Sequence, residues 1–359
     1  MTIDTAALAS PVCPAPVEGD RITLLHGAGT GASARLFEQV LLPRLRSAPL
    51  EERHDGAVLL LPGGDRLAFT TDTYVVSPLE FPGGDIGSLA VHGTVNDLAM
   101  CGARPLALSC ALVLEEGLPL ATLERVLDSM AAAARAAGIP IVTGDTKVVE
   151  RGKGDALFVN TAGVGLVPAG RDLRPARVQV GDRILVSGSL ARHGVAVLSQ
   201  REGLAFESDI TSDSAPLACL VEAMCTAAPD IHCLRDPTRG GLGAVLHEIA
   251  AAAGVEIEVD EASLPFDPAV RAACELLGLD PLFLASEGRC VVFVPPALEP
   301  ALLAAMRSRP DAVGAVTVGE VVGTNAGRRP VPGRVVIRTQ MGGRRLLERP
   351  LGEPLPRIC

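Results

Sequence analysis

The sequence predicts a mixed α/β (α+β) protein of two domains, and three observations support this prediction. The chain has 359 residues, whereas a single domain commonly has about 150. Its hydrophobic fraction of 48% is enough to fill two buried cores. Strand-like and helix-like segments alternate in both halves of the chain, as is typical of mixed α/β folds.

The first predicted domain spans residues 21–168. Its expected strands are short apolar or extended stretches: 22–25, 58–61, 67–71, 74–77, 139–142 and 157–167. Two amphipathic or apolar segments, 86–100 and 119–137, are each followed by a glycine, Gly102 and Gly138. Because glycine commonly ends a helix, both segments are expected to be helical.

The second predicted domain spans residues 169–343 and begins in a stretch rich in proline, glycine and arginine, residues 168–177. Strands are expected at 183–186, 255–259 and 291–294. Helices are expected near Val195 and Leu217 and after Gly240.

The two ends of the chain look different from the domains. Residues 1–20 contain no basic region followed by a long apolar run, so they are expected to be disordered and not a secretory signal. Residues 344–359 contain three prolines and no periodicity, and are expected to form a mobile tail. The last residue of this tail is Cys359.

Composition excludes several classes of function. The net charge of -10 argues against nucleic-acid binding, which requires a basic surface. Apolar runs are too short for the roughly 18 residues that cross a bilayer, so no membrane contact is expected. Nine cysteines, an odd number, do not form a disulfide framework. The sequence therefore predicts a cytoplasmic protein.

A glycine-rich segment, residues 26–31, stands between a strand-like run and an expected helix. Gly27 and Gly29 allow backbone N–H groups to approach a phosphate, and a helix start favours an anion. The segment lacks the Lys-Ser/Thr pair of a P-loop, and a histidine placed like His26 is more often structural than catalytic, so the segment alone is weak evidence for a phosphate site.

Four aspartates follow strands or interrupt an apolar helix. Asp72, Asp145 and Asp236 stand where strands are expected to end, and Asp97 lies in the apolar segment 86–100. An aspartate after a strand is often a turn or helix cap, but an unpaired carboxylate on an apolar face is costly to bury. Carboxylates that converge provide the oxygen ligands that Mg²⁺ prefers.

Lys147 and Glu287 are candidates for acid–base or charge-stabilising roles. The chain has 32 basic residues, and only Lys147 and Lys153 are lysine. Lys147 follows Asp145 and Thr146, which favours a compact ammonium with a specific task over a surface charge. Glu287 stands between two apolar stretches, where burial raises a carboxyl pKa and suits a base. An ion pair with Arg289 is an equally good explanation of Glu287.

Together these segments resemble the HypE family of hydrogenase maturation proteins. The stretches that carry the resemblance run from residue 22 to the end: His26 to Gly31, Thr71-Asp72, Gly84 to Gly87, Val95 to Met100, Gly102 to Pro105, Thr143 to Val148, Arg235 to Gly241, Ala285 to Gly288 and Pro356-Arg357-Ile358-Cys359. Asn-Asp and Asp-Pro-Thr-Arg-Gly-Gly are shared with the wider ATP-using superfamily of aminoimidazole ribonucleotide synthetase and selenophosphate synthetase. The final Pro-Arg-Ile-Cys is specific to HypE.

The resemblance implies a two-domain aminoimidazole ribonucleotide synthetase-like fold with a flexible C-terminal tail. It also implies a homodimer formed through the first domain, with ATP and Mg²⁺ as cofactors. The implied nucleotide contacts are His26, Gly27, Gly29, Asn96, Thr146, Arg235, Thr238 and Gly240. The implied metal ligands are Asp72, Asp97, Asp145 and Asp236, and the implied catalytic residues are Cys359, Lys147 and Glu287.

The implied activity is an ATP-dependent carbamoyl dehydratase. A carbamoyltransferase, HypF, loads a carbamoyl group on Cys359, the thiocarboxamide is dehydrated to a thiocyanate, and cyanide passes to the HypC-HypD complex for the nickel-iron site. Two alternatives remain: a selenophosphate-synthetase-like kinase of a small molecule, and a non-enzymatic metal carrier that uses thiols.

Overall fold

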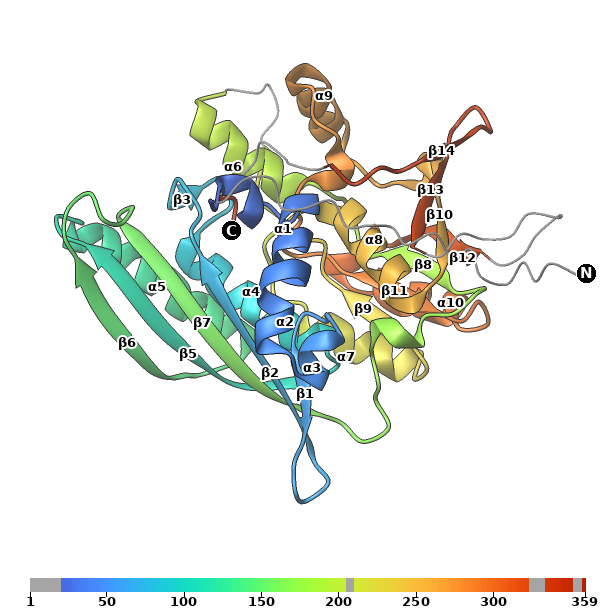
Figure 1. Ribbon diagram of the computed structural model, residues 1–359, viewed down its shortest axis with the longest axis horizontal. Helices are drawn as coiled ribbons and strands as arrows, with labels where there is room; N and C mark the ends of the chain where they lie inside the picture. Colours follow the sequence, from blue (N-terminus) through green and yellow to red (C-terminus); the bar gives the residue numbers. More distant parts are fainter. Residues whose placement is uncertain (1–20, 205–209, 323–332, 351–356) are drawn as a thin grey trace, which may run out of the picture.

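The computed structural model describes residues 21–204, 210–322, 333–350 and 357–359. It confirms the two-domain α/β prediction, because a five-stranded sheet and a seven-stranded sheet, each with helices, follow one another along the chain (Figure 1). The predicted disordered segment 1–20 and residues 351–356 of the predicted tail lie outside the described residues.

The sheet of the first domain has the strand order β1-β2-β7-β5-β6. Its strands are β1 (Ala57–Leu60), β2 (Arg66–Tyr74), β5 (Arg104–Glu115), β6 (Ile141–Val149) and β7 (Leu157–Val167). All neighbours are antiparallel except β5 and β6. Helix α4 (Ile86–Met100) packs on β2 and β7, and α5 (Leu120–Ala137) packs on α4. Both helices therefore cover the same face of the sheet.

The opposite face of this sheet is only partly covered in the described part of the chain, by the N-terminal helices near β1 and β2. Alternate residues of β7 are buried, as expected for a sheet with one packed face. Phe69 and Leu166 project from the other face and are exposed, as are Val142 and Val148 on the edge strand β6.

The sheet of the second domain has the order β14-β13-β10-β12-β8-β11-β9. Its strands are β8 (Arg183–Val186), β9 (Cys233–Arg235), β10 (Glu256–Asp260), β11 (Val291–Val294), β12 (Val316–Val322), β13 (Arg334–Arg338) and β14 (Arg344–Leu346). Its helices are α6 (Arg192–Glu202), α7 (Ala218–Ala227), α8 (Gly241–Ala253), α9 (Pro268–Leu277) and α10 (Glu299–Arg307).

The central strands of this second sheet are buried on both faces. Along β11, Val291 and Phe293 pack in the core under α8, while Val292 and Val294 pack in a separate core with α7 and α10. Because both faces are covered, these strands appear in the sequence as continuous apolar runs without polar alternation.

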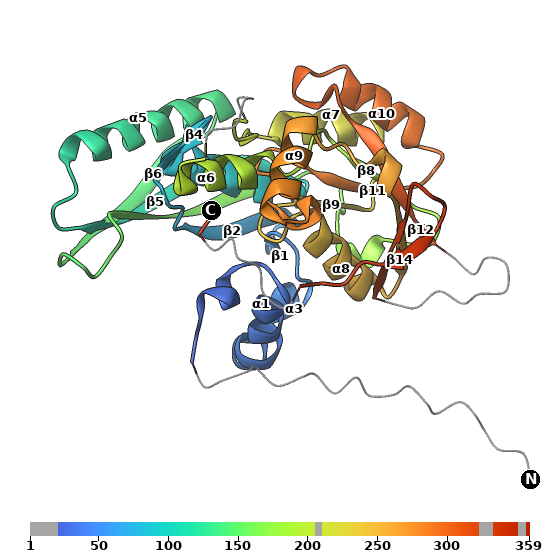
Figure 2. The same cartoon turned by 90° about the horizontal axis from the view of Figure 1, so that it is seen from above.

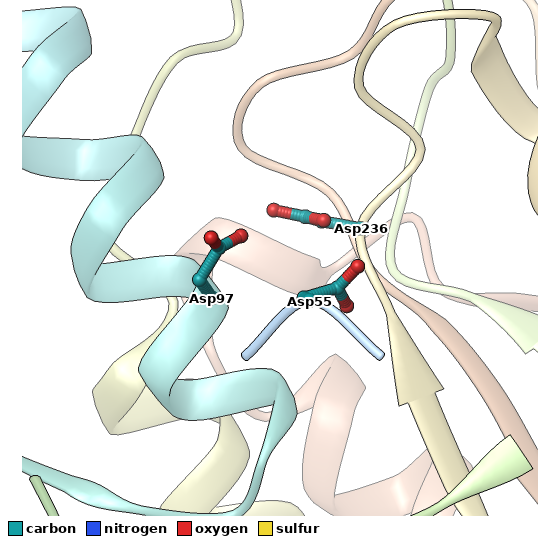
Figure 3. Close-up of side chains that lie close together, drawn as sticks. All are labelled: Asp55, Asp97 and Asp236. Atoms are coloured by element: carbon teal, nitrogen blue, oxygen red, sulfur yellow. The ribbon is translucent and has the colours of Figure 1, made fainter. Parts of the chain in front are cut away.

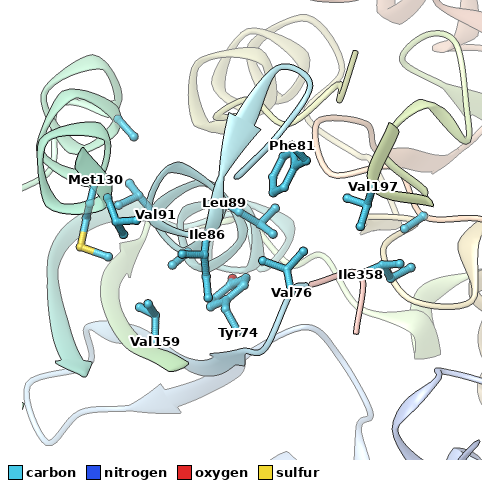
Figure 4. Close-up of a cluster of buried hydrophobic side chains, with 14 of the residues drawn as sticks. Tyr74, Val76, Phe81, Ile86, Leu89, Val91, Met130, Val159, Val197 and Ile358 are labelled. Carbon is cyan, nitrogen blue, oxygen red and sulfur yellow. The ribbon is translucent and has the colours of Figure 1, made fainter. Parts of the chain in front are cut away.

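A third core joins the two domains and supports the site described below. It combines residues of β2, α4 and the short strand β3 (Glu80–Phe81), which pairs with β4 (Gly84–Asp85), with residues of α6 and α9; β3 contributes Phe81. Figure 4 shows this cluster, in which Ile358 lies near Val76 and Val197. Residues of the predicted tail are therefore part of a core that both domains share.

The N-terminal residues form short helices outside both sheets (Figure 2). They are the 3₁₀ helix η1 (Leu24–Gly27), α1 (Gly31–Leu36), the π-helix η2 (Phe37–Leu41), α2 (Leu42–Leu45) and α3 (Ala48–Glu51). The strand predicted at 22–25 is wrong, because these residues lack a neighbouring strand and His26 Nδ1 accepts a hydrogen bond from the Thr23 N–H at 3.0 Å.

None of the helices in the described ranges combines the length and apolarity that crossing a bilayer requires.

Candidate active site

Three aspartates from separate parts of the chain meet where the two domains join (Figure 3). Asp55 precedes β1, Asp97 lies on α4, and Asp236 follows β9. One carboxylate oxygen of each lies within 4.8 Å of the others. The sequence predicts Asp97 and Asp236 as metal ligands, whereas Asp55 is a residue that sequence reasoning missed.

Asp72, another predicted ligand, lies near the end of β2 beside this group. It lines two cavities that Asp97 and Asp236 also line. The hydroxyl of Tyr74 donates a hydrogen bond to Asp72 Oδ2 at 3.2 Å. Four carboxylates therefore face one region between the domains.

The proximity of these groups changes their acidity. Burial and the neighbouring carboxylates raise the pKa values of Asp97 and Asp236 well above the usual range for aspartate. Burial also raises the pKa of Asp55, to about 6, although Arg235 opposes the shift. A carboxylate that is both buried and close to like charges is expected to hold its proton.

The donor set fits a hard divalent cation such as Mg²⁺. The Oδ2 atoms of Asp55 and Asp236 are buried and find no hydrogen-bond partner among the described residues. A buried carboxylate oxygen without a partner is costly, and a cation bound between the carboxylates removes that cost. Oxygen ligands at converging positions are those that Mg²⁺ takes.

Arg235 lies beside this group but is already paired. Its Nε lies 2.5 Å from Asp55 Oδ1, and its Nη2 lies 3.0 Å from Glu248 Oε2. Arg235 lines the cavity at the carboxylates. The sequence predicts it as a nucleotide contact, but its guanidinium mainly fixes Asp55 and Glu248 in place.

Three cavities follow one another through this region. The carboxylate cavity, of about 290 Å³, is lined by Asp55, Asp72, Asp97 and Asp236 and also by the predicted contacts His26, Gly27, Gly29 and Thr238. On one side it shares His26, Gly29, Ser33, Asp55 and Glu248 with an apolar cavity of about 750 Å³. On the other side it shares Asp72, Asp97, Asp236, Thr238 and Arg239 with a thiol cavity of about 50 Å³.

The thiol cavity contains Cys359 and Glu287, which the sequence predicts as catalytic residues. Glu287 is 2% exposed, and burial, Asp213 and Asp72 raise its pKa to about 8. Burial raises the pKa of the Cys359 thiol to about 12, although Arg239 opposes the shift. The docked thiol is therefore protonated near neutral pH. Glu287, by contrast, gains or loses its proton at a pH close to neutral.

Two glycines allow the wall of the carboxylate cavity to form. A Cβ on Gly29 would lie 2.6 Å from the backbone carbon of Arg239, and one on Gly240 would lie 2.5 Å from the carbonyl oxygen of Gly29. Both have positive φ, 74° and 78°. Only glycine fits such a close approach of two backbones in this conformation. Gly240 thus shapes the site instead of lining it.

Asn96 has a role different from the predicted nucleotide contact. Its Nδ2 donates to the carbonyl oxygens of Ala215 and Glu287 at 3.0 and 3.1 Å, and its Oδ1 accepts the N–H of Leu217 at 2.7 Å. The side chain is fully buried. These three bonds occupy the amide, so Asn96 holds the loop that carries Glu287.

The predicted residues Asp145, Thr146 and Lys147 lie apart from the three cavities in this chain. They are on the exposed edge strand β6, and Asp145 and Lys147 form an ion pair with each other. Their side chains are 61% and 69% exposed. The structure therefore does not bring these three residues together with Asp72, Asp97, Asp236 and Glu287 within one chain.

The predicted tail is anchored at both of its described ends. Residues 344–346 form β14, which pairs with β13, and the next residue, Leu347, is buried. Arg349 Nη2 lies 3.0 Å from Glu248 Oε1, beside the carboxylate cavity. Ile358 is only 4% exposed. The expected mobile tail starting at residue 344 is thus wrong for its first residues, because β13 offers a free edge to pair with.

Sequence reasoning missed Asp55, Tyr74 and Arg239 in the site. Asp55 had a signal, since an acid before Gly56 and an apolar strand resembles the other aspartates that flank strands. Tyr74 is the only tyrosine of the chain, and its hydroxyl lies where a Cβ on Gly93 would be 2.1 Å away. This packing of a helix glycine on a strand residue has no signature in a single sequence.

Comparisons with known proteins agree with this geometry. The family model of the AIR synthase related protein N-terminal domain matches residues 53–167, and the model of the corresponding C-terminal domain matches residues 179–331. Thiamine monophosphate kinase of Aquifex aeolicus, at 19% identity and a TM-score of 0.59, shares the fold.

Relatives at much higher identity cover nearly the whole chain. Carbamoyl dehydratase HypE of Cupriavidus necator is 51% identical over 346 residues, which are 96% of this chain and 97% of that protein. HypE of Escherichia coli is 47% identical over 344 residues, 95% of this chain and 100% of that protein.

Solved structures give the same result. A HypE structure in complex with ATP has 48% identity and a TM-score of 0.79, and the match covers 94% of this chain and 100% of that one. The HypE chain of a HypE-HypF complex has 42% identity and a TM-score of 0.82, covering 88% and 99%. With both domain models matched and close relatives over nearly its full length, the chain belongs to the HypE family of AIR synthase related proteins.

Proposed function

We propose that this protein is an ATP-dependent carbamoyl dehydratase that acts in hydrogenase maturation. It converts a carbamoyl group on Cys359, a thiocarboxamide, to a thiocyanate that supplies cyanide ligands for a nickel-iron site. The observation that carries the proposal is the small cavity in which the Cys359 thiol and the Glu287 carboxyl lie beside the aspartates. Relatives named carbamoyl dehydratase and a relative solved with ATP support it.

The order of the three cavities implies an orientation for bound ATP. Phe37, Leu50 and Phe69 line the apolar cavity, which suits an adenine ring. The carboxylate cavity next to it, with Gly27 and Gly29, suits the phosphates. The γ-phosphate then points to the thiol cavity and Cys359.

Asp55, Asp72, Asp97 and Asp236 are the residues that would hold Mg²⁺ with the nucleotide. When bound, the metal supplies positive charge that offsets the phosphates and the carboxylates. Among the predicted metal ligands, Asp145 is replaced in this chain's own site by Asp55.

The chemistry starts at the carbamoyl oxygen, which is a poor leaving group. Its attack on the γ-phosphorus forms an O–P bond, breaks the bond from that phosphorus to ADP and makes the oxygen part of a phosphate. Arg239, whose pKa is raised first of all by Cys359 nearby, lies where a cation offsets charge on the phosphoryl group. Positioning and charge stabilisation of this kind are the main contributions of proteins to phosphoryl transfer.

The second stage forms the nitrile. Glu287 takes a proton from the nitrogen, the nitrogen lone pair forms the additional C–N bond, and the C–O bond breaks to release phosphate. The other N–H proton leaves with that phosphate, so the thiocarboxamide loses the elements of water. A carboxyl group with a pKa of about 8 is suited to accept a proton near neutral pH.

Loading of Cys359 requires a different position of the tail. In the docked position Cys359 is partly buried and its thiol is protonated, because the pKa is raised to about 12, so the thiol is a poor nucleophile. We therefore propose that a HypF-like carbamoyltransferase receives the tail outside the cavity; a relative solved as a HypE-HypF complex supports the choice of partner. A HypC-HypD complex is the proposed acceptor of the cyanide.

A homodimer through the first domain explains the position of Lys147. The edge of β6, which pairs with one strand in the described part of the chain and carries the exposed Val142 and Val148, offers hydrogen-bonding and apolar groups to a second copy. In such a symmetric dimer, Asp145, Thr146 and Lys147 of one chain act in the site of its partner. Lys147 then supplies a compact cation near the transferred phosphoryl group.

Mass spectrometry of the C-terminal peptide tests the proposed function. After incubation with ATP, Mg²⁺, carbamoyl phosphate and the transferase, we expect a carbamoyl adduct on Cys359 that changes to a cyano adduct only when ATP is hydrolysed. A carbamoyl adduct that persists while ATP is consumed would contradict dehydration.

The same experiment separates the alternatives. A small-molecule kinase predicts unchanged ATP turnover in a variant with Cys359→Ala. A thiol metal carrier predicts bound Ni or Zn without ATP hydrolysis, but the metal-binding group found in the described ranges consists of three aspartates and no cysteine.

A further inference from the structure

Residues 357–359 bind next to residues 75–77 in an antiparallel arrangement. The N–H of Val75 donates to the Cys359 carbonyl at 3.0 Å, and the N–H of Ser77 donates to the Arg357 carbonyl at 3.2 Å. Adding a strand-like peptide to exposed backbone groups in this way fixes the register of the peptide. The two bonds leave the carbonyl of the middle residue, Ile358, without a partner in residues 75–77.

His193 binds that remaining carbonyl. Its Nε2 lies 2.6 Å from the oxygen of Ile358, and its Nδ1 lies 2.8 Å from Ser212 Oγ. The ring is fully buried and packs edge-on against Phe81, with 5.2 Å between the ring centres. Burial lowers the pKa of His193 to about 4, so the ring is neutral. The consistent tautomer donates from Nε2 to the tail and accepts at Nδ1 from Ser212.

The residues after Ser212 hold the proposed base. Asp213 Oδ1 accepts the N–H of Glu287 at 3.1 Å. The two backbones are so close that a Cβ on Gly288 would lie 1.9 Å from the carbonyl oxygen of Asp213. Asn96 joins both segments, because it donates to the carbonyls of Ala215 and Glu287. We call residues 211–215 the bridging loop.

The bridging loop therefore contacts the tail and the base through consecutive residues. Ser212 reaches Ile358 through one imidazole, and Asp213 binds Glu287 directly. The loop itself is fixed on the first domain, since the N–H of Ser212 donates to the Pro82 carbonyl at 2.8 Å. These contacts form a contiguous network between Ile358 and Glu287, through which a change at one end can reach the other.

We propose that His193 is a positioning residue that sets the depth of Cys359 in the thiol cavity and, through the bridging loop, couples docking of the tail to the placement of Glu287. This inference rests on the proposed function, which makes Cys359 the residue that carries the reacting group. The base is then held in place by the same contacts that a docked tail completes.

Thermodynamic linkage makes the proposal specific. If docking of the tail stabilises the loop at Glu287, then loosening that loop must weaken docking by the same free energy. Asp213 forms hydrogen bonds or ion pairs with Glu287 and Arg289 and not with residues 357–359, so a substitution there is expected to expose Cys359 only through the loop. A buried histidine that only fills the core predicts no such effect.

The alkylation rate of Cys359 in the full-length protein measures docking without any reaction of ATP. N-ethylmaleimide is added, and the C-terminal peptide is followed by mass spectrometry, which separates Cys359 from Cys219 and the other thiols. His193→Ala should raise the rate about tenfold, the change expected for loss of one buried hydrogen bond. Asp213→Ala should raise it about threefold through the linkage.

Two variants keep the test interpretable. His193→Gln retains an N–H donor and should restore most of the protection of Cys359. His232→Ala, which removes a buried histidine paired with Asp182 at 2.8 Å in the second domain, should leave Cys359 protected. These variants separate loss of the bond to Ile358 from general loosening of the fold.

The outcomes discriminate between parts of the proposal. Unchanged alkylation in His193→Ala would overturn the positioning role, and so would equal exposure in His193→Ala and His232→Ala. Exposure in His193→Ala with a wild-type rate in Asp213→Ala would overturn the coupling to Glu287. Because no ATP or carbamoyl phosphate is used, failure of the dehydratase reaction leaves these results standing, and the reverse also holds.

Discussion

The cleft between the domains and the edge strand β6 both carry predicted site residues, but they give those residues opposite environments. On α4, burial and like charges raise the pKa of Asp97 well above its usual range. On β6, a hydrogen bond and the charge of Lys147 lower the pKa of the exposed Asp145. Aspartate is therefore expected to be protonated in the cleft and ionised on β6.

This difference shows that the predicted site residues of one chain lie in two separate places, the cleft and strand β6. A nearby cation favours the ionised form of Asp97, so its carboxyl is expected to lose its proton when Mg²⁺ and nucleotide bind. Asp145 already has a cation, and its strand faces solvent. If both act on one substrate, a second copy of the chain must bring β6 to the cleft.

The largest effect is expected from the cleft. Cys359→Ala should abolish formation of the cyano adduct, because it removes the atom that carries the carbamoyl group. Intact-mass spectra after complete reaction mixtures measure this. Cys219→Ala, which changes an exposed cysteine, is the control and should form the adduct normally. A cyano adduct in the Cys359→Ala protein would show that a residue other than Cys359 carries the reacting group.

Glu287→Gln should slow dehydration by about 10² to 10⁴, the usual contribution of a positioned base, with little change in ATP affinity. In the wild type the folded-state pKa of Glu287 is raised to about 8, so the carboxylate form and the rate should increase from pH 7 to pH 9. Single-turnover rates of dehydration measured from pH 7 to pH 9 test whether the rate rises with pH as expected. A flat profile that Glu287→Gln shares with the wild type would assign the proton transfer to another group.

Lys147→Ala should be strongly impaired, and Lys147→Arg nearly as much, because a planar guanidinium does not replace a compact ammonium. Mixing the Lys147→Ala protein with the Cys359→Ala protein distinguishes the two locations. If Lys147 acts in the partner's site, randomly mixed dimers should recover about a quarter of wild-type activity. If it acts within its own chain, the mixture stays inactive, and if it has no role, the Lys147→Ala protein is active by itself.

The smallest effect is on stability. Asp236→Asn should stabilise the metal-free protein by on the order of 1 kcal/mol, because it removes repulsion in the cleft, while weakening Mg·ATP binding. Asp145→Asn on β6 is the matched control and should leave thermal stability unchanged. Differential scanning calorimetry and titration calorimetry measure the two quantities. Equal stability changes in both variants would mean that repulsion among the cleft carboxylates does not lower the stability of the metal-free protein.

The same carboxylates set a pH dependence. A carboxyl whose pKa is raised on folding holds protons that the unfolded chain has lost, so stability falls as pH rises from about 4 to the folded pKa. For Asp55 that window ends at about 6. Mg²⁺ should therefore raise the melting temperature more at pH 8 than at pH 5, whereas a uniform effect would argue against binding at these carboxylates.

Strong local patterns in the sequence predicted much of the fold. The helix at 86–100 and the strand at 157–167 agree with α4 and β7, since apolar periodicity and glycine stops define them. Strand β5 was not expected, because residues 104–115 are rich in leucine and alanine and contain only one β-branched residue, Val113, of the kind that signals a strand. Its pairing with β6 and β7 overrides that local preference.

The site was predictable as a set of residues but not as an arrangement. Asp72, Asp97, Asp236, Glu287 and Cys359 come together as the resemblance implied. Asn96 and Arg235 carry polar groups that point to nucleotide contact, yet the structure uses them to hold Glu287 and Asp55. Which partner satisfies a buried amide or guanidinium depends on segments that a single sequence does not place next to each other.

The bond from Arg357 Nε to the Val75 carbonyl joins residues 282 positions apart. On the ribosome, the β2 segment emerges long before residues 357–359 can reach it, and such distant contacts form late in folding. Ile358 then closes a core begun by Val76 and continued by Val197. A nascent chain therefore contains Asp55, Asp97 and Asp236 before it contains the residues that complete this shared core.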